Sequence, residues 1–299
     1  MIGVDWGTTS FRAYRFGPDG AVRDRKASAL GIMNVPDARF ADTLRAEIGP
    51  WLAAGDDRVL LSGMIGSRQG WVETPYLPCP AGLDDIAAAL IDVAFDWARV
   101  KLVLGLSATD AAGVAEVMRG EETQILGVPT LLAEGGTACL PGTHAKWADV
   151  ADGRIVGFST HMTGEVFAAL RGATILGRTM TDPARNNDAF AQGVRRSADP
   201  GGLLHHIFGV RAQTLTGALT ESDAASYLSG ILIGHEIRAQ LDTGRPIWLV
   251  GSDTHLSDCY AQAIALCGGV ARQPDNTDPA AAIGLAAIAA RANWNRSAR

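Results

Sequence analysis

A short pattern occurs twice in this chain, at positions about 135 residues apart. Each copy runs from an apolar stretch through a Gly-Thr pair, a second stretch, an Asp-Gly pair and a third stretch into helical spacing. The Gly-Thr pairs are Gly7-Thr8 and Gly142-Thr143, and the Asp-Gly pairs are Asp19-Gly20 and Asp152-Gly153. Gly and Asp favour tight turns between strands, so each copy predicts an antiparallel meander followed by a helix. The repeat therefore indicates an internal duplication.

Length and composition agree with two globular halves. The chain has 299 residues, of which 47% are hydrophobic and 19% charged, which suits two ordinary domains rather than a disordered chain. We therefore expect an α/β protein whose halves meet across a cleft, with a boundary near 128–136. Residues 179–245 are expected to be mainly helical and are a candidate contact for a homodimer.

Hydrophobic periodicity predicts the remaining elements. Further strands are expected at 58–62, 101–106 and 246–251. Helices are expected at 38–52, 84–97, 189–209, 222–241, 256–267 and 280–291. Small residues dominate the last helix, which permits close packing.

The charge pattern argues against two classes of partner. The net charge is -6 and no Lys/Arg run is present, so we expect neither nucleic acid nor an anionic membrane as a partner. The opening MIGVDWG lacks the basic and apolar regions of a signal peptide, and no apolar run reaches membrane-spanning length. The four cysteines form no CxxC pair, which is typical of reduced thiols. We therefore expect a cytoplasmic protein.

The first Gly-Thr turn belongs to the motif Asp5-Trp6-Gly7-Thr8-Thr9-Ser10. A glycine at such a turn lets the backbone approach phosphate oxygens, to which the neighbouring hydroxyls can donate hydrogen bonds. An aspartate at the end of a strand can hold magnesium, directly or through water. No Gly-Lys-Ser/Thr follows, so this is not a Walker A loop. A plain hairpin turn with polar residues is the alternative.

The second Gly-Thr turn lies in Leu140-Pro-Gly-Thr-His-Ala-Lys-Trp147. Two such turns on opposite sides of a cleft would hold a polyphosphate from both sides. His144 and Lys146 add candidate phosphate contacts. The alternatives are a hydrogen-bonded turn histidine and a solvated lysine. A third junction, Gly251-Ser252, follows a strand and precedes a helix, which suits the adenosine part of a nucleotide but is common in other proteins.

Two glutamates, Glu121 and Glu122, come shortly before the second turn. A kinase needs a carboxylate that orients or deprotonates the attacking hydroxyl. The alternative is a structural role, because negative charge in the first turn of a helix is stabilised by roughly 0.3–1 kcal/mol.

An irregular segment, 62–80, combines glycines and prolines with an arginine, an amide, an indole and a carboxylate. Arg68 can bind a carboxylate through two hydrogen bonds. Gln69 and Glu73 can bind hydroxyls, and Trp71 offers an apolar wall. The alternative is a rigid Pro/Gly loop with an exposed arginine, although so irregular a segment seldom serves packing alone.

Several segments together resemble one family. They are SGMIGSRQGWVETPYLPCPA, VMRGEETQI, LPGTHAKW, MTGE and YLSGILIGHE. The opening Asp5–Arg12 is similar to that of glycerol-kinase-like carbohydrate kinases. As a set, the segments look like the 2-dehydro-3-deoxygalactonokinase family over essentially the whole chain.

The resemblance implies the actin and hexokinase superfold, with two actin-like (ribonuclease H-like) domains at 1–130 and 131–299 whose mixed sheets are flanked by helices. It implies phosphorylation of 2-dehydro-3-deoxy-D-galactonate at the 6-hydroxyl with ATP and magnesium, in galactonate breakdown. The alternatives are a kinase for the gluconate epimer or another small sugar acid, and a polyphosphate or nucleotide phosphohydrolase of the same superfold. A nucleotide-switched filament or binding protein is disfavoured by the rich 62–80 loop.

The resemblance also implies roles for single residues. Asp5 supports magnesium, and Arg68 meets the carboxylate of the sugar acid. The phosphates are lined on one side by Gly7, Thr8, Thr9 and Arg12, and on the other by Gly142, Thr143 and His144. Gly251 and Ser252 border the nucleoside.

The glutamate pair departs from the glycerol-kinase pattern, which has aspartate in the catalytic helix. Exopolyphosphatase-type proteins of the superfold use glutamate there. The spacing from the pair to Gly127 is short against both patterns. We favour Glu122 over Glu121 as the base.

Overall fold

The computed structural model describes residues 1–181, 185–242, 244–251, 253–276 and 278–295. It divides into two compact units. Unit 1 comprises Met1–Gly135, Ala148–Phe158 and Pro274–Arg299, and unit 2 comprises Gly136–Trp147 and Ser159–Gln273. Each unit is a group of residues that contact one another more than they contact the rest of the chain. The predicted domains at 1–130 and 131–299 remain a prediction.

Unit 1 is built on a six-stranded mixed sheet with the order β3-β2-β1-β4-β8-β7. Its strands are β1 (Ile2–Trp6), β2 (Phe11–Phe16), β3 (Val22–Ser28), β4 (Arg58–Ser62), β7 (Ile91–Val93) and β8 (Arg99–Leu102). β2 is antiparallel to β1 and β3, whereas β4 is parallel to β1 and β8. The antiparallel meander expected at the start of the chain is confirmed.

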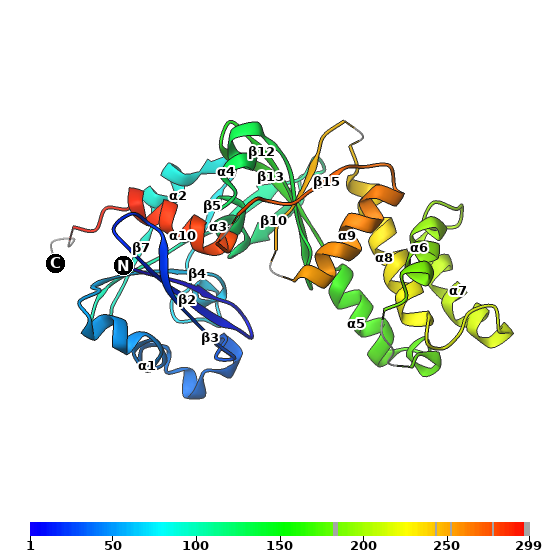
Figure 1. Ribbon diagram of the computed structural model, residues 1–299, viewed down its shortest axis with the longest axis horizontal. Coiled ribbons are helices and arrows are strands. Elements are labelled where there is room, and N and C mark those ends of the chain that lie inside the picture. Colours follow the sequence, from blue (N-terminus) through cyan, green and yellow to red (C-terminus); the bar gives the residue numbers. More distant parts are fainter. Residues whose placement is uncertain (182–184, 243, 252, 277, 296–299) are drawn as a thin grey trace. The chain divides into compact units, whose positions relative to one another are not determined.

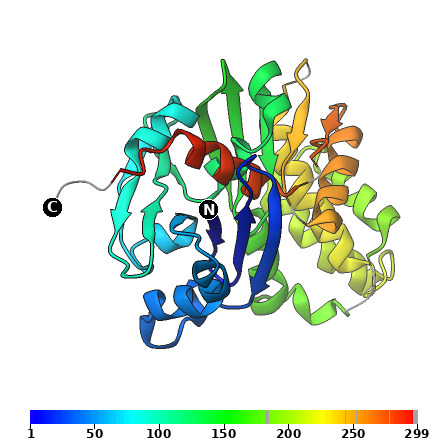
Figure 2. The ribbon, with the colours of Figure 1, turned by 60° about the vertical axis from the view of Figure 1, so that its left-hand side comes forward.

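Helices cover both faces of this sheet (Figures 1 and 2). On one face Ile2 and Val4 pack in a buried cluster with Leu44 and Ile48 of α1 (Phe40–Ala53). Successive residues of a strand point to opposite faces. Accordingly, a Cβ atom at Gly3 would lie 3.1 Å from Cβ of Leu285 in α10 (Ala280–Arg291), the red helix beside the blue strands.

The C-terminal helix α10 also packs closely on α3 (Glu121–Ile125). A Cβ atom at Gly284 would lie 1.9 Å from the carbonyl oxygen of Thr123, and one at Gly127 would lie 1.8 Å from that of Ala280. Neither position therefore tolerates a side chain, and the close packing expected from the small residues of this helix is confirmed.

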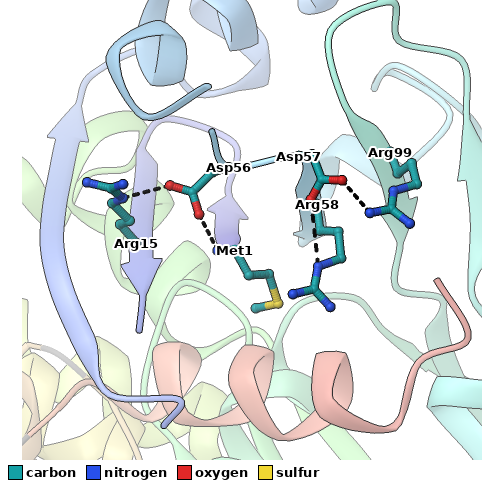
Figure 3. A network of polar contacts seen from close by, with 6 residues as sticks. All are labelled: Met1, Arg15, Asp56, Asp57, Arg58 and Arg99. Carbon is teal, nitrogen blue, oxygen red and sulfur yellow. Dashed lines mark hydrogen bonds and ion pairs between the residues drawn. The ribbon is translucent and has the colours of Figure 1, made fainter. Parts of the chain in front are cut away.

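Ion pairs hold the end of the sheet where β1 and β4 begin (Figure 3). Asp56 accepts hydrogen bonds from the amino group of Met1 and from Nε of Arg15, the latter at 2.7 Å. Asp57 pairs with Arg58 and with Arg99 at the start of β8. These contacts join four neighbouring strands and fix the parallel register of β1 and β4.

Unit 1 also contains a second, smaller sheet and several short elements. A three-stranded sheet has the order β10-β9-β5, formed by β10 (Ala115–Met118), β9 (Gly105–Thr109) and β5 (Tyr76–Pro78). β6 (Ala81–Gly82) pairs with Arg154 and Ile155 of β13 (Arg154–His161). α4 (Pro129–Glu134) follows α3.

Two of the predicted elements in this unit are wrong. The helix expected at 84–97 ends early, as α2 (Leu83–Ala89), and Ile91–Val93 is an edge strand because Val93 enters the core cluster beside β8. The strand expected at 101–106 is divided between β8 and β9, which belong to different sheets. The division falls before Gly105, where a Cβ atom would lie 2.5 Å from the carbonyl oxygen of Met118.

Unit 2 combines a sheet with a group of helices. Its strands are β11 (Gly136–Leu140), β14 (Ile247–Leu249) and β15 (Ala271–Arg272), which neighbour one another in the order β15-β14-β11. Unit 2 also holds the start of β12 (Ala145–Ala151) and the end of β13, whose other residues belong to unit 1. β14 is parallel to both β11 and β15. The helices, which gather together in Figure 1, are α5 (Thr163–Ala173), α6 (Asn187–Arg196), α7 (Gly202–Thr216), α8 (Ala224–Gln240) and α9 (Thr254–Leu266).

The stretch between β13 and β14 is mainly helical, as its spacing predicted. The single helix expected at 189–209 is wrong, because α6 and α7 are separated by a turn containing Pro200 and Gly201. Gly201 has a φ of 123°, a conformation that a helix cannot accommodate. None of the helices within the described residues is long and apolar enough to cross a bilayer.

Candidate active site

Asp5 lies near the end of β1, between two neighbouring strands. Its register partners are Arg12 on β2 and Ser62 on β4. Nη1 of Arg12 donates a hydrogen bond to Oδ2 of Asp5 at 3.3 Å. Burial raises the pKa of Asp5, and the guanidinium of Arg12 opposes that shift. A buried carboxylate in this state gains from a further cation, so the position suits a metal ion.

The turn after Asp5 is held by the chain that follows β3. Gly7 donates its N–H to the carbonyl of Ser10 at 2.9 Å. The N–H groups of Ile32 and Met33 donate to the carbonyls of Gly7 and Thr8, at 3.0 and 3.1 Å. Thr8 and Thr9 are exposed. The carbonyls of Gly7 and Thr8 are thus used in hydrogen bonds within unit 1. The hydroxyls of Thr8 and Thr9 remain accessible to a phosphate.

Glu122 is completely buried in the first turn of α3. Its Oε2 accepts the N–H of Gly120 at 2.7 Å, and its Oε1 accepts the hydroxyl of Thr123 at 3.2 Å. Burial, with the neighbouring charge of Glu121, raises the pKa of Glu122 to about 8. Glu121 is only partly buried, and its Oε2 accepts the N–H of Arg119 at 2.9 Å.

Unit 1 brings Asp5 and Glu122 to the same end of β1 and β4. Ser62, the β4 neighbour of Asp5, shares a hydrogen bond of 2.7 Å with the hydroxyl of Thr123, which in turn bonds Glu122. Two glycines allow the approach, since a Cβ atom at Gly63 would lie 2.8 Å from the carbonyl oxygen of Trp6, and one at Gly120 would lie 3.1 Å from Cα of Gly63. Such a pair suits phosphoryl transfer, in which one carboxylate holds a metal and another receives a proton.

The loop expected to bind the acceptor begins directly after β4. Arg68 and Gln69 lie exposed at its tip, and no described residue bonds their side chains. Glu73 is also exposed. Trp71 is half-buried against the core cluster, with its ring centroid 6.0 Å from that of Phe95. The indole therefore has a packing role in addition to any contact with a ligand.

The second Gly-Thr turn joins β11 to β12 in unit 2, and the start of α5 packs against it. The N–H of Glu165 donates to the carbonyl of Thr143 at 3.0 Å. A Cβ atom at Gly164 would lie 2.5 Å from the carbonyl oxygen of Gly142, so only glycine fits there. His144 is exposed and bonds the carboxylate of Glu165. The segment Met162–Glu165 therefore supports this turn through backbone contacts and through the bond of Glu165 to His144.

Lys146 is not the solvated lysine considered above. Its side chain is buried on β12, and its ammonium donates to Oγ1 of Thr160 on β13 at 2.9 Å. This lysine therefore braces the two strands beside the turn.

A cavity of about 550 Å³ opens beside the second turn, wholly within unit 2. Gly142 and Thr143 line it together with side chains that the sequence reasoning missed. These include Phe167 and Arg171 of α5, Arg185, and Leu256 and Tyr260 of α9. The cavity is of ordinary size for a nucleotide-sized ligand, and arginines beside apolar side chains suit an anionic ligand with a flat base.

Gly251 lies between β14 and α9, whose first turn borders this cavity. Asp253 caps that helix by accepting the N–H of Leu256 at 3.0 Å. Ser252 lies outside the described residues.

No group of three or more metal-binding side chains occurs among the residues that the structure describes. Magnesium in kinases usually takes one or two carboxylates and fills its remaining positions with water and phosphate oxygens. A single carboxylate at the end of a strand, as Asp5 is, fits that pattern.

Comparison with known proteins identifies the family. The family model described as 2-keto-3-deoxy-galactonokinase matches residues 5–288. The chain belongs to this family. A relative from Rhizobium meliloti strain 1021, named "Probable 2-dehydro-3-deoxygalactonokinase DgoK1", is 38% identical over 97% of this chain and 96% of its own. The 2-dehydro-3-deoxygalactonokinase of Escherichia coli K12 is 32% identical over 89% of this chain and 90% of its own.

Solved structures agree with this result. The crystal structure of a Sinorhizobium meliloti protein, described as a 2-dehydro-3-deoxygalactonokinase protein, is 34% identical, has a TM-score of 0.85 and covers 97% of both chains. Component A of the (R)-2-hydroxyglutaryl-CoA dehydratase of Acidaminococcus fermentans is only 10% identical, and its TM-score of 0.51 reports on the fold alone. The kinase family and the mixed α/β fold predicted from the sequence are therefore confirmed.

Proposed function

We propose that this chain transfers the γ-phosphoryl group of ATP to the 6-hydroxyl of 2-dehydro-3-deoxy-D-galactonate. Membership of the kinase family over residues 5–288 supports the substrate class. The observation that carries the chemistry is the pair of buried carboxylates: Glu122 is hydrogen-bonded to Thr123, which bonds Ser62, the neighbour of Asp5 on β4. We place the reaction in the cytoplasm, with the helical region 179–245 as the candidate homodimer contact.

Glu122 is the proposed base. It takes the proton of the 6-hydroxyl while that oxygen forms a bond to the γ-phosphorus and the bond from phosphorus to the ADP oxygen breaks. A pKa of about 8 makes it a stronger base than an ordinary glutamate. Glu121, which is partly exposed and one residue away, is the other candidate for this role.

The two Gly-Thr turns are proposed to bind the phosphates of ATP. Gly7, Thr8, Thr9 and Arg12 are the proposed phosphate contacts at the first turn, and Gly142, Thr143 and His144 are those at the second. Asp5 would hold magnesium, which neutralises charge on the phosphate oxygens when it is bound. The cavity beside Thr143 is the proposed nucleoside pocket. Gly251 and Ser252 are proposed to contact the nucleoside.

The 62–80 loop is the proposed acceptor site. Arg68 has its guanidinium exposed at the tip of the loop and free of described partners, which suits bidentate binding of the sugar-acid carboxylate. Gln69 and Glu73 are proposed to bind hydroxyls, and Trp71 to form an apolar wall.

Identification of the product tests this proposal. The purified protein is incubated with ATP, magnesium and 2-dehydro-3-deoxy-D-galactonate, and the product is examined by phosphorus NMR and mass spectrometry. We expect a single phosphomonoester on C6. Release of inorganic phosphate without an organic ester would instead support a phosphohydrolase.

A further inference from the structure

Arg119 lies between the proposed base and the acceptor loop, and the sequence reasoning gave it no role. It follows β10 and directly precedes Gly120, Glu121 and Glu122. Its side chain is only 8% exposed. Within the described residues, no carboxylate bonds its guanidinium. Burial of a cation among neutral partners is costly, so stability alone does not explain this arginine.

The guanidinium of Arg119 donates its two hydrogen bonds to one residue of the acceptor loop, Thr74. Nη1 donates to the hydroxyl of Thr74, and Nη2 donates to the carbonyl of Thr74 at 2.8 Å. The guanidinium carbon also lies 4.5 Å from the ring centroid of Tyr76. The planar fork of an arginine makes two such bonds and stacks on an aromatic ring at once, which a lysine cannot do.

Thr74 is the point at which the acceptor loop closes on itself. Its N–H donates to the carbonyl of Gly66 at 3.0 Å, and its hydroxyl faces the same oxygen at 3.3 Å. The residues between Gly66 and Thr74 therefore form a closed loop that carries Arg68 and Gln69. The hydrogen bonds of Arg119 to Thr74 stabilise this closure.

The same arginine is bonded to the glutamate pair through its backbone, because its N–H donates to Oε2 of Glu121 at 2.9 Å. A bond from Gly120 to Glu122 continues this connection. Arg119 is thus bonded through its side chain to the closure of the acceptor loop and through its backbone to Glu121, the residue next to the proposed base.

We infer that Arg119 is a positioning residue, which sets the acceptor loop relative to the glutamate pair and so determines how well the sugar acid binds. This role rests on the proposed function, because it assigns the acceptor to that loop. Arg119 itself does not contact the reacting atoms.

The test compares Arg119→Lys with the wild type in the full-length chain. We expect the KM for 2-dehydro-3-deoxygalactonate to rise by about 10-fold or more, because the two bonds to Thr74 are lost, while the KM for ATP changes by less than about 3-fold. Thr74→Val should raise the acceptor KM in the same direction, whereas Thr74→Ser should retain wild-type values. The double variant Arg119→Lys/Thr74→Val should be no worse than Arg119→Lys alone.

Arg15→Lys is the matched control. Arg15 also makes a partly buried bond in unit 1, but to Asp56 at the far end of β2. It should leave the acceptor KM unchanged. An unchanged acceptor KM in folded Arg119→Lys, or equal rises for both substrates, would overturn the inference.

Hydrogen exchange gives a readout that does not depend on activity. Amides of Gly66, Gly70, Trp71 and Thr74 should exchange about 10-fold faster or more in Arg119→Lys, with the amides of β1 and β4 unchanged. Unchanged exchange in the loop contradicts the inference. Failure of the wild type to phosphorylate the sugar acid contradicts the proposed function, so the two failures are distinguishable.

Discussion

The N–H of Gly120 donates a hydrogen bond of 2.7 Å to Oε2 of Glu122, inside a pocket that excludes water from the carboxylate. If Glu122 is the base, Glu122→Gln should lower kcat by about 10²- to 10⁴-fold. Glu121→Gln should lower it by less than about 10-fold, because the amide oxygen of the new glutamine can still accept the N–H of Arg119. Steady-state kinetics of both variants decide the assignment. Near-normal turnover in both would remove the glutamates from catalysis, and a larger loss in Glu121→Gln would exchange their roles.

The raised pKa of Glu122 also makes stability depend on pH. The folded protein keeps this proton up to a pH of about 8, whereas the unfolded chain releases it near 4.5. The folded state therefore loses stability as the pH rises through that interval. Glu122→Gln removes the titration, so its Tm relative to the wild type should be higher at pH 9 than at pH 5. Thermal unfolding measures this, and parallel Tm curves for the two proteins would contradict it.

Gly164 should be intolerant of substitution because of its contact with the second Gly-Thr turn. In Gly164→Ala the new methyl group would meet the carbonyl of Gly142 and displace the turn, so kcat/KM for ATP should fall by about 10-fold or more. Gly172→Ala is the control in the same helix, since that position faces open space. It should stabilise the protein by about 0.5–1 kcal/mol without altering kinetics. Equal effects of the two variants on kcat/KM would show that the turn is not involved.

Arg68 should matter for the acceptor and not for ATP. Loss of a bidentate, charge-assisted contact in Arg68→Gln should raise the acceptor KM by about 10- to 100-fold. Arg23→Gln is the control. It changes an exposed arginine of β3 that pairs with Asp19, and it should have no such effect. Initial rates over a range of acceptor concentrations make the comparison. An acceptor KM in Arg68→Gln that matches Arg23→Gln would place the carboxylate elsewhere.

The parts that sequence predicted well rest on local patterns. The meander of β1, β2 and β3 follows from turn residues and apolar runs, and β4 has the predicted limits. The segment 84–97 was misassigned because its apolar spacing fits a helix and a strand equally, and only the packing of Val93 into the core decides between them.

The candidate site shows the same division. Asp5, the glutamate pair and both Gly-Thr turns were predicted as candidate site residues from short motifs, because the residues of each motif are adjacent in the sequence. The role of Arg119 depends on Thr74, which lies 45 positions away, and no local signal marks such a contact. The cavity of unit 2 likewise collects Phe167, Arg185 and Tyr260 from separate helices and the loop between them.

The most direct test of the kinase assignment is a coupled assay of ADP release with three conditions: 2-dehydro-3-deoxy-D-galactonate, its gluconate epimer, and no acceptor. The account predicts rapid release that requires an acceptor, with a higher kcat/KM for the galactonate-derived compound. Release at the same rate without any acceptor would contradict it.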